Sequence, residues 1–214
     1  MPGKRDFKRK SGLRDARLII IAAEGEKTEK IYFDGLKDYY KNPRVHVEVL
    51  DHLLPGSEPE KIILTLDAFR SEYKLRKGYD LLWLVIDVDR WRQKLAFVAQ
   101  QCLQKQYYLA VSNPAFEIWL LLHIRDLASY PANVLAEFLE NRKTGDRTCV
   151  SLELLNLLGG YNKTNPDMAY FAPRVQNAIE NGRAADPNPE SRWPNQPGSR
   201  VYLLAEKIVP QENS

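Results

Sequence analysis

The stretch RLIIIAAEGEKTEKIYFDGL, residues 17–36, decides the fold of this chain. It opens with a continuous apolar run, residues 18–23, which is typical of a strand buried on both faces. The run stops at Glu24 and Gly25, and apolar residues at helical spacing follow over residues 27–40. A glycine alone is enough to end a strand, so the cluster of acids at this tip needs a further explanation.

The strand-then-helix order continues as far as residue 123. Strands are predicted over residues 45–50, 79–90 and 107–111, and helices over residues 57–78, 91–104 and 114–123. This alternation predicts an α/β domain with a largely parallel sheet flanked by helices. With 214 residues the chain is long enough to bury a core without disulfides or a structural metal.

The pattern changes after about residue 125, where helices and loops replace the alternation. Residues 186–200 are rich in Pro and Asn and are not expected to form regular structure, whereas residues 199–209 form a final amphipathic stretch. The sequence therefore predicts three parts. They are a basic flexible arm over residues 1–16, an α/β core over 17–124, and a helical extension over 125–214 that packs on the core.

Charge is unevenly distributed along the chain. The net charge is +3, and residues 1–17 carry seven Lys or Arg against two Asp, which leaves a slight negative excess on the rest. A basic arm on a nearly neutral body favours a polyanion such as nucleic acid as partner, although such arms also serve as solubilising tails. No signal peptide, membrane-spanning stretch or paired cysteine spacing is present, which predicts a cytoplasmic protein without membrane contact.

Two apolar strands end in carboxylates, at Glu24 and at Asp87 and Asp89. In extended backbone, residues two apart point to the same side, so Asp87 and Asp89 are expected to converge. If the two strands are neighbours, the three carboxylates form a self-repelling cluster that calls for a cation, and hard oxygen ligands suit Mg²⁺ or Mn²⁺. The alternative is that these acids cap the helices that follow them.

The quoted motifs resemble those of a known family. AAEGEKTEKIYF (residues 22–33) and LLWLVIDVDR (residues 81–90) are similar to the Toprim domain, and closest to its overcoming-lysogenization-defect type. Together with NPAFEIWLLLH (residues 113–123), GYNKTNP (160–166) and QPGSRVYLLAEKI (196–208), they resemble the RloB family over residues 17–209. The resemblance implies a Toprim-like, Rossmann-like catalytic core, genes beside restriction or phage-defence loci, and often an SMC-like or AAA-type ATPase partner.

The resemblance also implies roles for individual acids. Glu24 corresponds to a metal ligand or general base, Asp87 and Asp89 to metal ligands, and Glu29 to a ligand of a second metal. For Glu29 the alternative is a solvated acid in the first turn of a helix, where the helix dipole favours negative charge.

Two further candidates come from the residues themselves. Glu117 follows the fourth strand among apolar neighbours, where a charge needs a partner, so it is predicted to act as a metal ligand or base. Lys163 follows a glycine pair and is predicted to neutralise charge on a phosphate, the alternative being a solvated loop lysine. His123 is expected to be a packing histidine.

These features favour a Mg²⁺-dependent nuclease that hydrolyses DNA or RNA in antiviral defence, with the basic arm and loop 141–147 holding the nucleic-acid backbone. Nucleotidyl transfer is less favoured, because the sequence has no zinc-ribbon cysteines. The remaining alternatives are a non-catalytic subunit that restrains an ATPase partner, and a domain that binds a nucleotide signal without cutting. The clustered carboxylates favour the enzyme.

Overall fold

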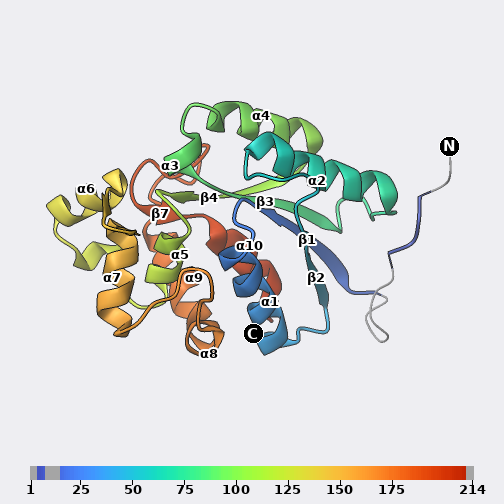
Figure 1. The fold of residues 1–214 in the computed structure, drawn as a ribbon. Helices are drawn as coiled ribbons and strands as arrows, with labels where there is room; N and C mark the ends of the chain where they lie inside the picture. The colour runs from blue at the N-terminus through green and yellow to red at the C-terminus, as the bar shows by residue number, and fades with distance from the viewer. Residues whose placement is uncertain (1–3, 8–14, 211–214) are drawn as a thin grey trace.

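The computed structural model describes residues 4–7 and 15–210, and it places a five-stranded sheet between two layers of helices (Figure 1). The strands are β1 (Arg17–Ala23), β2 (Val45–Val49), β3 (Leu81–Asp87), β4 (Tyr108–Asn113) and β7 (Gly198–Ser199), in the order β2-β1-β3-β4-β7. The first four are parallel, and β7 pairs antiparallel with β4. The predicted α/β class with a largely parallel sheet is therefore confirmed.

Helices cover both faces of the sheet. One face carries α2 (Pro59–Glu72) and α4 (Leu95–Lys105), and the other carries α1 (Thr28–Tyr40), α5 (Glu117–Leu122), α9 (Val175–Ala184) and α10 (Val201–Ile208). The shorter elements are α3 (Val88–Trp91), α6 (Ala132–Glu140), β5 (Lys143–Thr144), β6 (Arg147–Thr148), α7 (Cys149–Leu158), α8 (Met168–Phe171), and 3₁₀ turns at Leu127–Ser129 and Ala172–Arg174.

The apolar run of β1 is buried because both faces of its strand meet helices. Ile19, Ile21 and Ala23 belong to the cluster that includes α1, α5 and α10. The intervening residues, such as Leu18 and Ile20, belong to the cluster formed with α2 and α4. Each fully buried Leu or Ile side chain contributes about 1.5–3 kcal/mol, so this central strand anchors both layers.

The strand order places a topological switch point between β1 and β3. The connection after β1 runs by α1 to β2 on one side, whereas the connection after β3 runs by α4 to β4 on the other side. At such a point the two connections leave a crevice outside the carboxyl ends of the strands, where open α/β sheets bind ligands. The condition for the acids to meet, that these two strands are neighbours, is thereby fulfilled, with the Glu24 N–H donating to Val85 O at 2.9 Å.

The C-terminal part of the chain is integrated into the core and does not form a separate layer on it. It supplies β7 to the edge of the sheet, a strand that the sequence pattern did not predict, because two residues are too few to show a period. One apolar cluster runs from Ile19 to Val209 without a break between the predicted core and extension.

Most of the predicted basic arm lies outside the described residues. Its described part, residues 4–7, is docked on the body: the Lys74 N–H donates to Arg5 O at 2.9 Å, and the Phe7 ring lies 5.6 Å from that of Phe69. No helix in the described part of the chain is long and apolar enough to cross a membrane.

A buried ion pair fixes the Pro-rich loop that precedes β7. Arg200 Nε and Nη2 donate to the Asp186 carboxylate at 2.8 and 3.0 Å, and Nη2 also donates to Asn188 O at 3.0 Å. The two side chains are only 8% and 3% exposed. A loop without regular structure is thus held in one conformation by a bidentate guanidinium.

We expect Arg200→Met to lower the free energy of unfolding by about 3–5 kcal/mol, because it leaves the Asp186 carboxylate buried without its partner. The measurement is urea denaturation followed by circular dichroism. The matched control is Arg183→Met, whose ion pair with Glu206 is 64% and 20% exposed and should contribute less than about 1 kcal/mol. Equal losses in the two variants would contradict a structural role for the buried pair.

Candidate functional site

A cavity of about 410 Å³ opens at the switch point between β1 and β3. Every residue that the sequence singled out for catalysis or metal binding lines it; these are Glu24, Glu29, Asp87, Asp89, Glu117 and Lys163. Four segments that are distant in sequence meet there: the end of β1 with the start of α1, the end of β3, the start of α5, and the loop after α7. The fold therefore brings the predicted residues together, while their roles stay predictions.

Glu24 and Asp87 form the floor of this cavity. Glu24 is buried, and its Oε2 accepts a hydrogen bond from the Asp87 N–H at 3.1 Å. Asp87 Oδ1 is also buried, and no hydrogen-bond partner for it exists among the described residues. The alternative that Glu24 caps α1 is wrong, because the N-cap is Lys27, without a side-chain cap.

Asp89 reaches the cavity by a different route from the one predicted. The strand ends at Asp87, and Asp89 lies in the first turn of α3, so the two side chains do not alternate along one extended strand. The backbone turns because the Asp89 N–H donates to Pro114 O at 3.0 Å. Asp89 is exposed at the cavity rim, where Asn141 Nδ2 donates to its Oδ2 at 3.4 Å.

Glu29 is a buried acid of the cavity and not a solvated acid of the first helical turn. Its carboxylate lies over Gly25, at a position that the Cβ of any other residue would occupy, which explains why a glycine follows Glu24. Burial, helped by repulsion from the nearby Glu117 and Glu24 carboxylates, raises the pKa of Glu29 to about 7, against the lowering effects of a backbone hydrogen bond and Lys163.

Lys163 is paired with Glu117 and is not a freely solvated loop lysine. Its Nζ lies 2.6 Å from Glu117 Oε1, and the two side chains are 58% and 3% exposed. The loop is held at the site because Thr28 Oγ1 donates to Lys163 O at 2.6 Å. Burial tends to lower the pKa of Lys163, but Glu117, Asp87 and Glu29 outweigh it and the pKa is raised. The lysine therefore stays charged beside the acids.

Two residues of the cavity wall, Asn141 and Thr148, were not predicted as catalytic or metal-binding residues, although Asn141 belongs to the loop 141–147 that was predicted to hold the nucleic-acid backbone. Asn141 is the C-cap of α6 with φ of 45°, and its Oδ1 accepts from the Val150 N–H at 3.5 Å. An Asn after an apolar helical run signals a left-handed cap, which is all that the sequence pattern could have shown. The tertiary contact with Asp89 gives it a place in the site.

The clustered carboxylates give the cavity a negative electrostatic potential. Burial, followed by repulsion from Glu24, Glu29 and Glu117, raises the pKa of Asp87 well above its usual range. Within the described residues, no three His, Cys, Asp or Glu side chains form a ready set of metal ligands. The donor chemistry nevertheless fits a hard cation that keeps several waters, since Asp87 Oδ1 is a buried acceptor without a hydrogen-bond partner in the part of the chain that the structure describes. Glu24, Asp87 and Asp89 would hold such a cation, with Glu29 beside them.

His123, the histidine that the sequence analysis considered, has a structural role. His123 is buried, with a pKa that desolvation lowers to about 3; its Nδ1 donates to Trp119 O at 2.9 Å and its Nε2 accepts from Tyr32 Oη at 3.1 Å. It is therefore the packing histidine that was expected.

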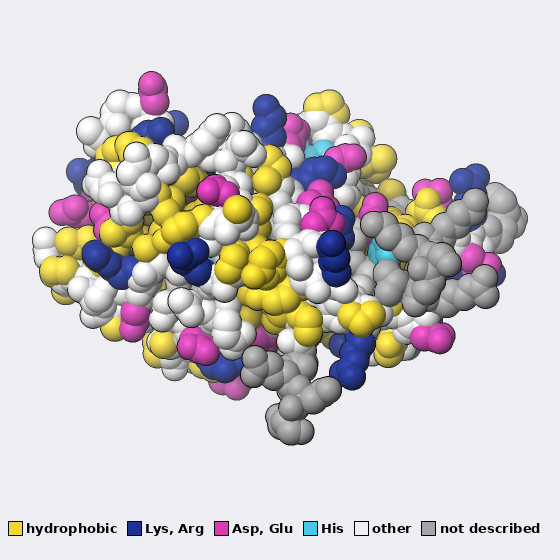
Figure 2. Space-filling view, turned by 90° about the horizontal axis from the view of Figure 1, so that it is seen from below, with side chains coloured by type: hydrophobic (Ala, Val, Ile, Leu, Met, Phe, Trp, Pro, Cys, Tyr) yellow, Lys and Arg dark blue, Asp and Glu magenta, His cyan; other side chains and the backbone are white. Residues whose placement is uncertain are grey.

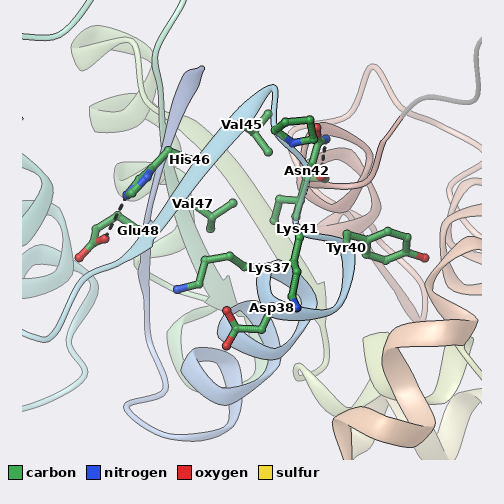
Figure 3. Close-up of a pocket in the computed structure, with 11 residues that line it drawn as sticks. Lys37, Asp38, Tyr40, Lys41, Asn42, Val45, His46, Val47 and Glu48 are labelled. Atoms are coloured by element: carbon green, nitrogen blue, oxygen red, sulfur yellow. Dashed lines mark hydrogen bonds and ion pairs between the residues drawn. The ribbon is translucent and has the colours of Figure 1, made fainter. Parts of the chain in front are cut away.

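A further cavity of about 340 Å³ lies between the end of α1 and β2 (Figure 3). There His46 faces Glu48 at 3.6 Å, and none of the clustered acids is present. On the face seen in Figure 2, the described basic and acidic side chains are interspersed and form no broad patch of one sign.

Comparison with known protein families finds a match that covers most of the chain. Residues 19–208 match the family described as RloB-like protein. This chain belongs to the RloB-like family. No curated protein and no solved structure matches it. The acids that line the cavity all lie within the matched residues.

Glu29→Gln is expected to gain stability relative to the wild type as the pH rises. The folded protein binds the Glu29 proton more tightly than the unfolded chain, whose pKa is near 4.5, so the wild type loses stability between pH 4.5 and about 7 and Gln does not. The expected difference between pH 5 and pH 8 is about 1–3 kcal/mol.

The free energies of unfolding would be measured in urea with EDTA present. Glu26→Gln, at the exposed rim of the same cavity, is the matched control and should follow the wild-type pH profile, because Glu29 is retained. Parallel pH profiles for Glu29→Gln and the wild type would contradict the buried position of this carboxyl group.

Proposed function

We propose that this RloB-like chain is a metal-dependent nuclease that hydrolyses a phosphodiester bond of DNA or RNA. The observation that carries the proposal is the convergence of six carboxylates on one cavity at the switch point, five of them the predicted acids, with Asp87 Oδ1 buried and without a hydrogen-bond partner among the described residues. A scaffold gains nothing from such a cluster, because like charges in a low-dielectric site oppose folding unless a ligand offsets them. A cation bound between protein and phosphate supplies that offset.

Each residue has a distinct task in this proposal. A divalent cation, Mg²⁺ or Mn²⁺, polarises a phosphate and lowers the pKa of a water molecule. Asp87 and Asp89 hold the cation, and Glu24, on the floor of the cavity, holds it or accepts the proton of the attacking water. Glu29, with a pKa of about 7, is poised to exchange a proton near neutral pH, as a general acid or base must.

The positive side of the cavity suits the phosphate. Lys163 stays protonated and sits on a loop that Thr28 ties to the start of α1, so its ammonium is positioned to neutralise charge that develops on the phosphate. Arg142 and Lys143 are exposed beside the cavity wall at Asn141, and they are placed to contact the nucleic-acid backbone beyond it. A role in antiviral defence and an SMC-like or AAA-type ATPase partner stay predictions from the family resemblance.

The first prediction concerns the metal. Calorimetry should detect Mg²⁺ or Mn²⁺ binding to the wild type and not to Asp87→Asn/Asp89→Asn, because amides do not replace two anionic ligands. Asp38→Asn, which removes a negative charge from the exposed end of α1, is the control and should bind as the wild type does. Equal and negligible binding to all three proteins, each folded by circular dichroism, would contradict the metal site.

The second prediction concerns the lysine. Lys163→Met should slow metal-dependent cleavage of single-stranded DNA or RNA by about 10²-fold or more, because one preorganised positive group at the phosphate is removed. Lys163→Arg should retain more activity, and Lys37→Met, on α1, should match the wild type. Metal binding to Lys163→Met is measured in parallel. Unchanged cleavage would show that Lys163 only balances the charge of Glu117.

A further inference from the structure

A second cavity, of about 420 Å³, lies on the other side of α3 from the acids. Its wall includes Val88, Arg92, Asn113, Glu140 and Trp193. None of these residues belongs to the acidic cavity, and the proposed chemistry makes no use of them.

The two cavities share one thin partition. Val88, which faces the second cavity, lies between Asp87 and Asp89, which face the first. The same alternation occurs at the end of α6, where Glu140 lines one cavity and Asn141 the other. A ligand whose phosphate occupies the acidic cavity therefore has its next covalent neighbour within reach of the second cavity.

Asn113 lines this second cavity and carries an unused hydrogen-bond acceptor. The residue is 4% exposed, and its Nδ2 donates to Pro194 O at 2.8 Å. This bond identifies the amide nitrogen, so the other atom is Oδ1, which is buried and without a hydrogen-bond partner among the described residues. A buried acceptor left unpaired costs about 1–3 kcal/mol, so a ligand N–H group that donates to it would recover that free energy.

Trp193 supplies a flat aromatic wall. It packs in part against the apolar cluster of α2 and α4, and it also lines the cavity. Its loop is rigid, because Ser191 Oγ donates to Trp193 O at 2.9 Å and Arg200 Nη2 donates to Ser191 Oγ at 3.1 Å. An indole held in this way can stack a planar ring without losing much side-chain freedom.

The charged side chains at the rim of the second cavity are compatible with a phosphate group beside it. Arg92 is exposed at the edge of the cavity, and Glu140, the acid of the rim, lies 3.0 Å from Arg142 Nε. The rim therefore presents Arg92, which has no ion pair among the described residues, beside an acid that is paired with Arg142, and this suits a phosphate backbone leading to a planar base.

We propose that this cavity binds one unstacked nucleobase, with its ring on Trp193 and an N–H group donating to Asn113 Oδ1. A base inside a duplex cannot enter, so the substrate is single-stranded or locally splayed nucleic acid. This inference names the substrate class of the proposed nuclease and rests on that function for its biological meaning, although the binding is testable without any cleavage.

The test measures binding in EDTA, so that no cleavage occurs, by fluorescence anisotropy. The probes are a fluorescein-labelled single-stranded oligonucleotide of mixed sequence, the same sequence as a duplex, and an oligomer of equal length made of abasic sites. We expect the wild type to bind the base-bearing single strand about tenfold more tightly than the abasic oligomer and the duplex. Trp193→Ala should remove this advantage without weakening abasic binding, and Trp193→Phe should keep most of it.

Tyr39→Ala removes an aromatic side chain that is 53% exposed on α1, and as the matched control it should bind as the wild type does. Should Trp193→Ala fail to fold, quenching of wild-type tryptophan fluorescence by the base-bearing strand but not by the abasic oligomer serves the same purpose. Equal binding of all three probes by the wild type, or an unchanged preference in folded Trp193→Ala, overturns the inference. A preference for the base-bearing strand without any metal-dependent cleavage would support the base-binding cavity and contradict the proposed nuclease function.

Discussion

The parallel pairing of β1 with β3 is the constraint on which the site depends. The register that aligns Ala23 with Val85 places the next residues of both strands at the same edge of the sheet. Glu24 then accepts a hydrogen bond from the backbone of Asp87, so one carboxylate is fixed directly against the residue that carries the other. Because both strands are buried on both faces, neither can slip in register without exposing its apolar side chains. The hydrophobic core thus determines the spacing of the acids.

The electrostatics of the cavity follow from that spacing. Carboxylates held close together in a poorly solvated crevice repel one another, and the raised pKa values of Glu29 and Asp87 are the direct consequence. Lys163 relieves part of this repulsion through Glu117 but remains more than half exposed. This repulsion destabilises the folded chain, and in the proposed function a bound cation would offset it. Such repulsion is typical of a functional site and costs the fold stability.

The C-terminal part of the chain completes the site and does not merely cover the sheet. Asn141, Thr148 and Lys163 all come from the segment that the sequence separated as an extension, and they close one wall of the acidic cavity. The Pro-rich loop held by Arg200 forms a wall of the neighbouring cavity through Trp193. A core ending at residue 124 would keep the acids but lose the lysine and both of these walls. The family match over residues 19–208 includes them.

The sequence by itself determined the class of the fold and which acids line the cavity. Strands buried on both faces appear as unbroken apolar runs, so β1 and β3 were predictable from local pattern, and the carboxyl ends of such strands are where acids meet. The tertiary structure decided the rest. Only the fold showed that Asp89 enters from a helical turn, that Glu29 is buried over Gly25, and that Asn141 contacts Asp89. Side-chain burial and long-range contacts depend on segments far apart in the chain, and local periodicity carries no information about which distant segments will pack together.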